Sequence, residues 1–488
     1  MIGNLLLLTL SFGVSVYSAR ILGAFTTPSI SHQIVFLPIM KELAARGHEV
    51  IIITTDPIKE DVPPTLRQIN VSFAYNLWNN DLENIIEDTK YNPVKLMDTF
   101  INVLNDINSR VLEHPDVQTL VHGNADKFDL FIVEYLIPTL YSLKHKFDCP
   151  MIGITSLDSP YDGHQAMGNP THPIVYPDFT LPFEDVKLKF FDRLTSYLFM
   201  QFSYIYDMVK FIPLQEDTKN KYFGKDYPHV TDVLNSVDML FINTNHIFHN
   251  IRPLTPATIS IGPFIHIKPP KPLPKDLNKF LDDAKEGFIY FSLGSNMKSK
   301  DLMESTRLSI LKTFAELPYK VLWKFESEDL PGKPENVKIL KWVPQQDVLR
   351  HKNIKVFITQ CGLQSLEEGL FNEVPFIGLP VFGDQPMNAV NMVSKGLGVK
   401  LNYESLTSDQ FKAAILEVIG DPKYKKRAEE LSRISKDEPM TGMEKAIFWS
   451  EYVIRNNGAQ HLKGAEGKIP LYQYYYLDIF VFLAFIFF

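Results

Sequence analysis

The sequence predicts an α/β protein built from two parallel-sheet domains. Near the start of the chain, a strand, a helix and a second strand follow one another at the spacing of a βαβ unit. The same alternation restarts after residue 280, and a proline-rich segment separates the two series. Because ligands of open parallel sheets bind at the carboxyl ends of the strands, we expect the binding site in a cleft between the domains.

The elements of the first half follow from its apolar pattern. Ile21–Phe25 is a short apolar run that predicts a strand, and His32–Arg46 carries apolar residues at helical spacing. Glu49–Thr55 predicts the next buried strand, and Leu130–Val133 a further one. We assign residues 20–250 to an amino-terminal domain.

The second half begins after a linker. Lys268–Pro274 holds four prolines and can sustain neither a helix nor a central strand, so we place the linker at residues 251–280. The second domain, residues 281–440, contains four runs that predict strands: Phe288–Ser292, Lys320–Lys324, Val356–Thr359 and Pro375–Pro380.

The amino-terminal end predicts a secretory signal peptide over residues 1–19. An apolar run from Leu5 to Val16 precedes the small residues Ser18 and Ala19, and it is shorter than the roughly 20 residues of a membrane span. An anchor helix or an amino-terminal strand is the alternative. The sequon at Asn70 fits a lumenal or extracellular destination and makes Asn70 a candidate glycosylation site.

The carboxyl-terminal residues 469–488 resemble a short membrane segment. Their last ten residues are apolar, but Pro470, Gln473 and Asp478 interrupt the segment and no basic stop-transfer sequence follows. We expect membrane association, with a helix docked on the body of the protein as the alternative.

Composition excludes several classes of protein. The net charge is −8 and no run rich in Lys and Arg occurs, so we expect no nucleic-acid partner. Cys149 and Cys361 are the two cysteines of the chain, too few for a disulfide framework and without the spacing of a zinc site. The sequence leaves self-association into a homo-oligomer open.

The segment 342–385 carries the strongest chemical signal. The strand before Gln360 runs into a small-residue loop, and a helix begins near Ser365. Because the free N–H groups of a helix N-terminus bind anions, this loop suits a diphosphate. Glu368 lies one turn inside the helix, where a carboxylate can accept from a ribose diol, and Trp342 can stack on a flat base. A Trp beside a proline is by itself more often a packing residue.

The whole stretch from Trp342 to Gln385 resembles the signature of the UDP-glycosyltransferases, which move a sugar from a UDP-sugar to a small lipophilic acceptor. Further resemblance lies at Ser31-His32, at Phe291–Ser295, at the linker 266–274 and at Trp449–Arg455. The chain is similar to insect or insect-virus members. The resemblance implies the GT-B fold, in which two Rossmann-like domains face each other across a cleft, and a return helix within residues 441–468.

The resemblance also implies the role of each donor-site residue. It assigns the sugar to Asp384 and Gln385, and the uracil and nucleoside to Trp342, Val343 and Gln345. It implies that the diphosphate is bound by Gln360, Gly362, Gln364 and Ser365 on one side and by Gly294 and Ser295 on the other. Glu368 is expected to bind the ribose. Many relatives have His in place of Gln360 and Gly in place of Cys361, and a Gln adds no titratable charge near the phosphates.

His32 is the candidate general base. The resemblance places the catalytic histidine there, and an imidazole is suited to taking a proton near neutral pH. Glu134 stands where relatives commonly have Asp and is expected to orient the ring. Since Glu is one methylene longer, a direct contact needs the two backbones to lie slightly further apart. Without the resemblance, His32 would be a helix-cap histidine and Glu134 a surface carboxylate.

The expected reaction is an inverting hexosyl transfer from a UDP-sugar to a hydroxyl group, with glucose favoured over glucuronate and detoxification or hormone inactivation as the role. The chain has no Asp-x-Asp triplet, so we expect no metal and no cofactor besides the donor. Histidines outside the first helix, among them His229, His246 and His266, are expected to be structural. The alternative is a nucleotide-sugar or lipophile-binding protein without turnover. The resemblance implies the endoplasmic reticulum membrane with lumenal domains, or secretion if the tail fails to anchor.

Overall fold

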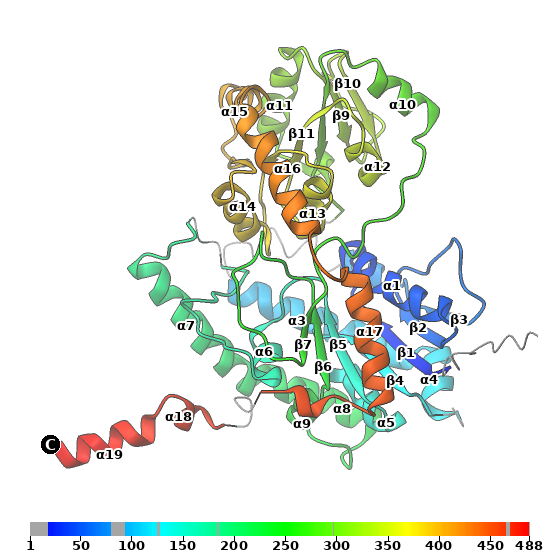
Figure 1. Ribbon diagram of the computed structural model, residues 1–488, viewed down its shortest axis with the longest axis vertical. Coiled ribbons are helices and arrows are strands. Elements are labelled where there is room, and N and C mark those ends of the chain that lie inside the picture. Colours follow the sequence, from blue (N-terminus) through cyan, green and yellow to red (C-terminus); the bar gives the residue numbers. More distant parts are fainter. Residues whose placement is uncertain are drawn as a thin grey trace, which may run out of the picture.

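Two parallel sheets dominate the computed structural model, which describes residues 18–79, 93–123, 127–181, 183, 185–295, 297–464 and 469–487. Each sheet lies in its own domain, and the domains are stacked along the long axis of the molecule (Figure 1). The predicted fold class, two α/β domains with parallel sheets, is confirmed. The expected signal peptide lies outside the described residues except for Ser18 and Ala19.

The amino-terminal sheet has seven strands in the order β3-β2-β1-β4-β5-β6-β7. The central strands are buried along most of their length because helices cover both faces. The strands are β1 (Arg20–Phe25), β2 (Glu49–Thr54), β3 (Leu66–Asn70), β4 (Leu130–Glu134), β5 (Met151–Thr155), β6 (Met239–Ile242) and β7 (Thr258–Ser260).

Two apolar clusters fill the space on either side of this sheet. Helices α3 (Pro93–Glu113) and α4 (Pro115–His122) border one cluster, and α1 (Ile30–Ala45) borders the other. The remaining helices of this domain are α5 (Leu143–Phe147), α6 (Tyr161–Met167), α7 (Phe190–Tyr206), α8 (Ile212–Phe223) and α9 (Val230–Asn235).

The carboxyl-terminal sheet has six strands in the order β10-β9-β8-β11-β12-β13. They are β8 (Phe288–Ser292), β9 (Lys320–Lys324), β10 (Val337–Leu340), β11 (Ile354–Thr359), β12 (Phe376–Gly378) and β13 (Gly398–Lys400). The helices are α10 (Lys275–Asp282), α11 (Glu304–Ala315), α12 (Gln345–Leu349), α13 (Leu363–Phe371), α14 (Gln385–Ser394), α15 (Ser408–Gly420) and α16 (Pro422–Lys436).

The irregular connection between the domains is shorter than the expected linker 251–280. The coil covers residues 261–274, because residues 258–260 pair with β6 as the edge strand β7. Helix α10 begins directly after Pro274, whose fixed backbone angle suits a helix start.

Helix α17 (Gly442–Arg455) carries the chain back to the amino-terminal domain. It packs against α1, β4 and β7, and its buried Ala446 and Ile447 belong to the core of the first sheet. Its first residue approaches the linker so closely that a Cβ atom on Gly442 would lie 1.7 Å from the carbonyl oxygen of Ile261.

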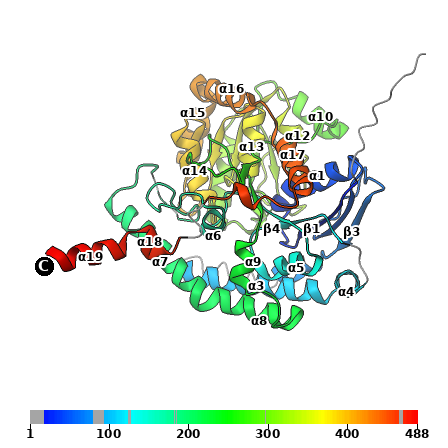
Figure 2. The same cartoon turned by 60° about the horizontal axis from the view of Figure 1, so that its bottom comes forward.

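The chain ends in two short helices, α18 (Leu471–Tyr474) and α19 (Leu477–Phe487), which project from the body beside α7 (Figures 1 and 2). Residues 477–487 are all exposed, so the expected alternative of a docked helix is wrong for α19. Among the described residues, no helix combines the length and the apolar character needed to cross a bilayer.

Aromatic side chains of α7 are also exposed, most of all Phe190 at 63 % and Phe191 at 75 %. Among the aromatic residues of α7, Tyr206 is buried, and Phe202 packs on the core beside it.

Candidate active site

His32 and Glu134 lie in direct contact at the carboxyl edge of the first sheet. Glu134 is the last residue of β4, and His32 lies in the first turn of α1, which follows the neighbouring strand β1. The ring Nδ1 is 2.6 Å from Oε1 of Glu134. The other carboxylate oxygen accepts from the backbone N–H of Thr27 at 3.4 Å, so the side chain is held at both oxygens. The extra methylene of Glu therefore does not prevent the contact.

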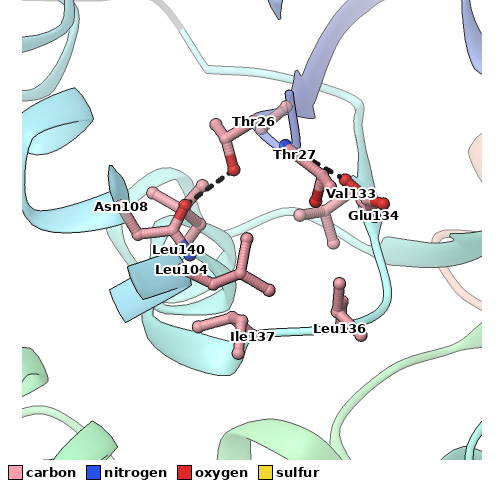
Figure 3. Close-up of a pocket in the computed structure, with 10 residues that line it drawn as sticks. Thr26, Thr27, Leu104, Asn108, Val133, Glu134, Leu136, Ile137 and Leu140 are labelled. Atoms are coloured by element: carbon pink, nitrogen blue, oxygen red, sulfur yellow. Dashed lines mark hydrogen bonds between the residues drawn. The ribbon is translucent and has the colours of Figure 1, made fainter. Parts of the chain in front are cut away.

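A small cavity opens beside this pair (Figure 3). Thr27 and Glu134 border it on one side, and a buried hydrogen bond from Thr26 Oγ1 to Asn108 Oδ1, 2.6 Å long, borders it on another. The rest of the wall is apolar and comes from Ala24, Leu104, Val133, Leu136, Ile137 and Leu140. The candidate base thus stands next to a mainly lipophilic wall.

The N-terminus of α13 faces the cleft from the second domain. Gly362 is its N-cap and provides no side-chain cap, so the first amides of the helix have no side-chain acceptor from that position. A Cβ on Gly362 would meet one neighbour, Gln360 Nε2, at 3.7 Å. The backbone at this point is open to a ligand, which is the arrangement that favours a diphosphate. The helix begins at Leu363, two residues before the expected start.

The loop after β8 closes the other side of this space. Gly294 has a φ of 77°, and a Cβ there would lie 2.2 Å from Gln360 Nε2. Gln360 is buried, and its Oε1 has no hydrogen-bond partner within the described part of the chain. Ser295 is exposed at the turn. Gly294 and Gly362 therefore both lie against the side chain of Gln360, and Ser295 follows Gly294 in the same loop.

Glu368 is held by two glutamine side chains. Gln345 Nε2 donates to Oε2 at 2.6 Å and to Ser365 Oγ at 3.0 Å, and Gln346 Nε2 donates to Oε1 at 2.9 Å. Burial raises the pKa of the Glu368 carboxyl, and the two donors act against that rise. The carboxylate is fixed in position before any ribose binds.

Trp342 has an exposed side chain on the second domain. Its side chain is 62 % exposed, and Lys324 Nζ lies 5.8 Å from its ring centroid. The neighbouring Val343 is buried and anchors the segment. An exposed indole on an anchored backbone has the form of a stacking platform for a base.

Asp384 and Gln385 lie at the start of α14. Gln385 Oε1 accepts from the backbone N–H groups of Val381 and Phe382, at 2.9 and 3.2 Å, and this fixes the turn. Asn388 Nδ2 donates to Asp384 Oδ2 at 2.5 Å. Burial raises the pKa of Asp384, while the side chain of Asn388 and the positive charge of His32, a residue of the other domain, act against that rise.

Both domains line the cleft around Asp384. A second cavity takes Asp384 and Asn388 from α14 and Asp158, Tyr176 and Arg252 from the amino-terminal domain. A sugar bound to Asp384 would therefore lie between the domains.

Two expected site residues lie elsewhere. Gln364 is buried, and its Nε2 donates to the carbonyl oxygen of Ser156 in the other domain at 2.8 Å, so its carboxamide is engaged away from the diphosphate space. Asn70 is exposed at the end of β3, outside the cleft, where a glycan has room.

Sequence reasoning missed three residues of this region. Gln346 and Asn388 hold Glu368 and Asp384, and Glu367 lies buried between the domains. Asn388 follows Asp384 by one helical turn, a signal that could have found it. Gln346 and Glu367 sit next to assigned residues, but only the fold shows where their side chains lie.

Comparisons with known proteins agree with this geometry. The family model of "UDP-glucoronosyl and UDP-glucosyl transferase" matches residues 25–488. UDP-glucosyltransferase 2 of Dactylopius coccus is 36% identical over 481 residues, which cover 95% of this chain and 90% of the relative. An ecdysteroid UDP-glucosyltransferase of Mamestra brassicae nuclear polyhedrosis virus is 30% identical, and the match covers 90% of this chain and 85% of that protein.

The fold is also that of solved glycosyltransferases. The crystal structure of TcCGT1 in complex with UDP matches with a TM-score of 0.59 at 15% identity, over 90% of this chain and all of that chain. The domains therefore have the GT-B arrangement that the sequence predicted. With a family model that spans almost the whole chain, this protein belongs to the UDP-glucuronosyl and UDP-glucosyl transferase family and is a UDP-glycosyltransferase.

Proposed function

We propose that the protein transfers a hexose from a UDP-sugar to the hydroxyl group of a small lipophilic molecule, with inversion at the anomeric carbon. The observation that carries this proposal is the His32–Glu134 contact of 2.6 Å at the carboxyl edge of the first sheet. A base held by a carboxylate is the machinery that a hydroxyl nucleophile requires.

The proton path follows from the contact. When Nδ1–H of His32 donates to Glu134, Nε2 carries the free lone pair. Nε2 takes the proton of the acceptor hydroxyl while its oxygen attacks the anomeric carbon, and the bond from that carbon to the UDP oxygen breaks. UDP leaves with the bonding electron pair, and the imidazolium is stabilised by Glu134. Attack opposite the leaving group turns an α-linked donor into a β-glycoside.

The donor side supplies charge stabilisation. We propose that the amides at the start of α13 and the backbone of Gly362 stabilise the charge of the leaving diphosphate, which the open surroundings of Gly362 support. We propose that Glu368 takes the ribose, Trp342 the uracil and Asp384 the sugar, and that the chain requires neither a metal nor a further cofactor.

Glucose is the proposed sugar because relatives from Dactylopius coccus and from nuclear polyhedrosis viruses are named glucosyltransferases. The mainly apolar lining of the small cavity next to Glu134 supports the proposal of a lipophilic acceptor, and detoxification or hormone inactivation is the corresponding role. We also propose attachment to the endoplasmic reticulum membrane with lumenal domains, supported by the exposed apolar helix α19.

The test is product formation from UDP-glucose and from UDP-glucuronate, measured by mass spectrometry against phenols, flavonoids and ecdysteroids. We expect glucoside formation by the wild type and a loss of about 10²–10⁴-fold in His32→Ala, the usual contribution of a general base. UDP binding without turnover in either protein would instead support the alternative of a nucleotide-sugar or lipophile-binding protein.

A further inference from the structure

The buried face of α13 joins the two domains through a group of polar side chains that the reaction does not use directly. Glu367 is fully buried, and the next residue, Glu368, is buried as well. Its Oε2 accepts from Asn243 Nδ2 at 3.4 Å and its Oε1 from Asn245 Nδ2 at 3.3 Å. Both asparagines directly follow β6 of the amino-terminal domain, so one carboxyl of the donor helix is held by the other domain.

His266 of the linker completes the group. Its Nε2 lies 3.3 Å from the carbonyl oxygen of Gln364, which can only accept, so Nε2 carries the proton. Its Nδ1 is then an acceptor, buried without a hydrogen-bond partner at normal distance in the described chain, and it lies 3.5 Å from Glu367 Oε2. A protonated Glu367 would place its O–H toward Nδ1 and would leave the pair uncharged.

The electrostatics agree with a neutral pair. Burial raises the pKa of Glu367 to about 8, and burial lowers the pKa of His266 to about 4. Asn243, Asn245 and the backbone of Phe264 face Glu367 as donors, His266 faces it from the linker, and Glu368 acts on it from the same helix.

We propose that Glu367 is a positioning residue that fixes the register of the two domains, so that the sugar bound at α13 and α14 meets His32. The proposal rests on the proposed transfer reaction. It follows from the placement of Glu367: the same helix presents its N-terminus to the donor and its buried carboxyl to β6 and the linker. Gln364 strengthens the contact through its bond to Ser156.

The proposal separates donor binding from turnover. In Glu367→Ala, the N-terminus of α13 and Glu368 remain, so we expect the Kd for UDP to stay within threefold of the wild type while kcat falls at least tenfold. Glu367→Gln keeps one oxygen to accept from Asn245 and gains an N–H donor toward Nδ1, and it gives up only the 3.4 Å contact from Asn243, so we expect kcat within threefold. The exposed Glu335→Ala serves as the matched control and should change neither quantity.

A double-mutant cycle approaches the contact from the other domain. Asn243→Ala should lower kcat. In the double variant Asn243→Ala/Glu367→Ala, the fold-loss of kcat should be smaller than the product of the two single fold-losses, because both changes remove the same contact. If the UDP Kd rises in step with the loss of kcat, or if kcat stays within threefold in Glu367→Ala, the assignment is overturned.

Hydrogen exchange tests the contact without turnover, and so distinguishes its failure from failure of the proposed reaction. The N–H groups of Ile247 and Phe248 donate to Asn245 Oδ1, and the same amide is held by Glu367. We expect both amides to exchange at least tenfold faster in Glu367→Ala than in Glu367→Gln or the control. Equal exchange in all three proteins would also overturn the proposal.

Discussion

At the residue scale, Glu134 decides how His32 presents its ring. The 2.6 Å contact to His32 Nδ1 and the hydrogen bond from the Thr27 N–H hold the Glu134 carboxylate in one orientation. Because Nδ1 is engaged by Glu134, Nε2 is the ring nitrogen left for the acceptor hydroxyl. In the proposed reaction the negative charge of Glu134 matters as well as its length, because it would stabilise the imidazolium that forms during transfer.

We therefore expect Glu134→Gln to lower kcat by about 10²–10⁴-fold, because an amide does not hold the required tautomer or offset the positive charge. The UDP Kd should stay unchanged, since the change lies in the other domain. Steady-state kinetics and calorimetric UDP titration check the two quantities. Glu49→Gln, an exposed carboxylate at the start of β2, is the control, and equal kcat in the two variants would contradict the role of Glu134.

Two tryptophans of the second domain should respond in opposite ways. Trp342 is 62 % exposed, so Trp342→Ala should leave the free energy of unfolding within about 0.5 kcal/mol. The same change should weaken UDP binding by about 1–3 kcal/mol, the usual size of base stacking. Trp323 is fully buried, and Trp323→Ala should cost about 3–5 kcal/mol of stability. Chemical denaturation and UDP titration measure both variants; unchanged UDP affinity in Trp342→Ala would remove the stacking assignment.

At the scale of the element, the loop between β11 and α13 is the proposed diphosphate site. The sequence predicted this site because a strand, a small-residue loop and a helix follow one another with the spacing that anion binding requires. The start of the helix was expected two residues late, since no capping side chain marks it and Gly362 takes that place.

Two glycines of the donor site should separate folding from binding. Gly362→Ala should fold with a stability within about 1 kcal/mol of the wild type, because its φ of −61° and its open surroundings accept a methyl group. UDP affinity should nevertheless fall at least about tenfold, about 1.4 kcal/mol, as the methyl enters the diphosphate space. Gly294→Ala should lose about 1–3 kcal/mol of stability, because its φ is positive and Gln360 blocks the new Cβ. Thermal unfolding with and without UDP distinguishes the cases, and a Gly362→Ala variant with wild-type affinity would contradict the anion site.

Strands were predicted well where apolar runs are long and buried. The runs that gave β1, β2, β4, β8, β9, β11 and β12 were found with end errors of at most two residues. The missed strands include the four edge strands β3, β7, β10 and β13, and also β5 and β6, which are fully buried. Short strands at a sheet edge acquire their structure from the neighbouring strand, and a local pattern does not show that neighbour.

At the scale of the whole molecule, contacts distant in sequence set the pH response. His266 was expected to be structural because no ligand cluster surrounds it in the sequence. Its partner Gln364 lies 98 positions away, and only the closed arrangement of both domains brings Glu367 beside it. No spacing rule would have paired these residues.

The buried pair predicts lower stability at alkaline pH. The pKa of Glu367 rises from 4.5 to about 8 on folding, so its stabilising contribution is complete below pH 4.5 and is lost as the pH rises to 8. The pKa of His266 falls from 6.5 to about 4, so its contribution is complete above pH 6.5 and is lost toward pH 4. The two slopes oppose each other below pH 6.5. Between pH 6.5 and 8 the loss from Glu367 acts alone, on the order of 1–2 kcal/mol.

Urea denaturation at pH 6.5 and pH 8 measures this loss. In Glu367→Gln, which does not titrate, we expect the difference between the two pH values to shrink by that amount. A wild type and a Glu367→Gln variant with the same pH dependence would show that another group is responsible.

The path of α17 has a consequence for exchanging modules between related enzymes. The core of the acceptor-side domain is completed by side chains that follow the donor-side domain in the sequence, and Gly442 lies against the linker with no room for a side chain. In a chimaera with a single junction at the linker, the amino-terminal core would come from one parent and the α17 side chains that complete it from the other. Recombination between family members should therefore keep residues 20–260 and 442–464 from one parent, with both junctions on the same side of the cleft.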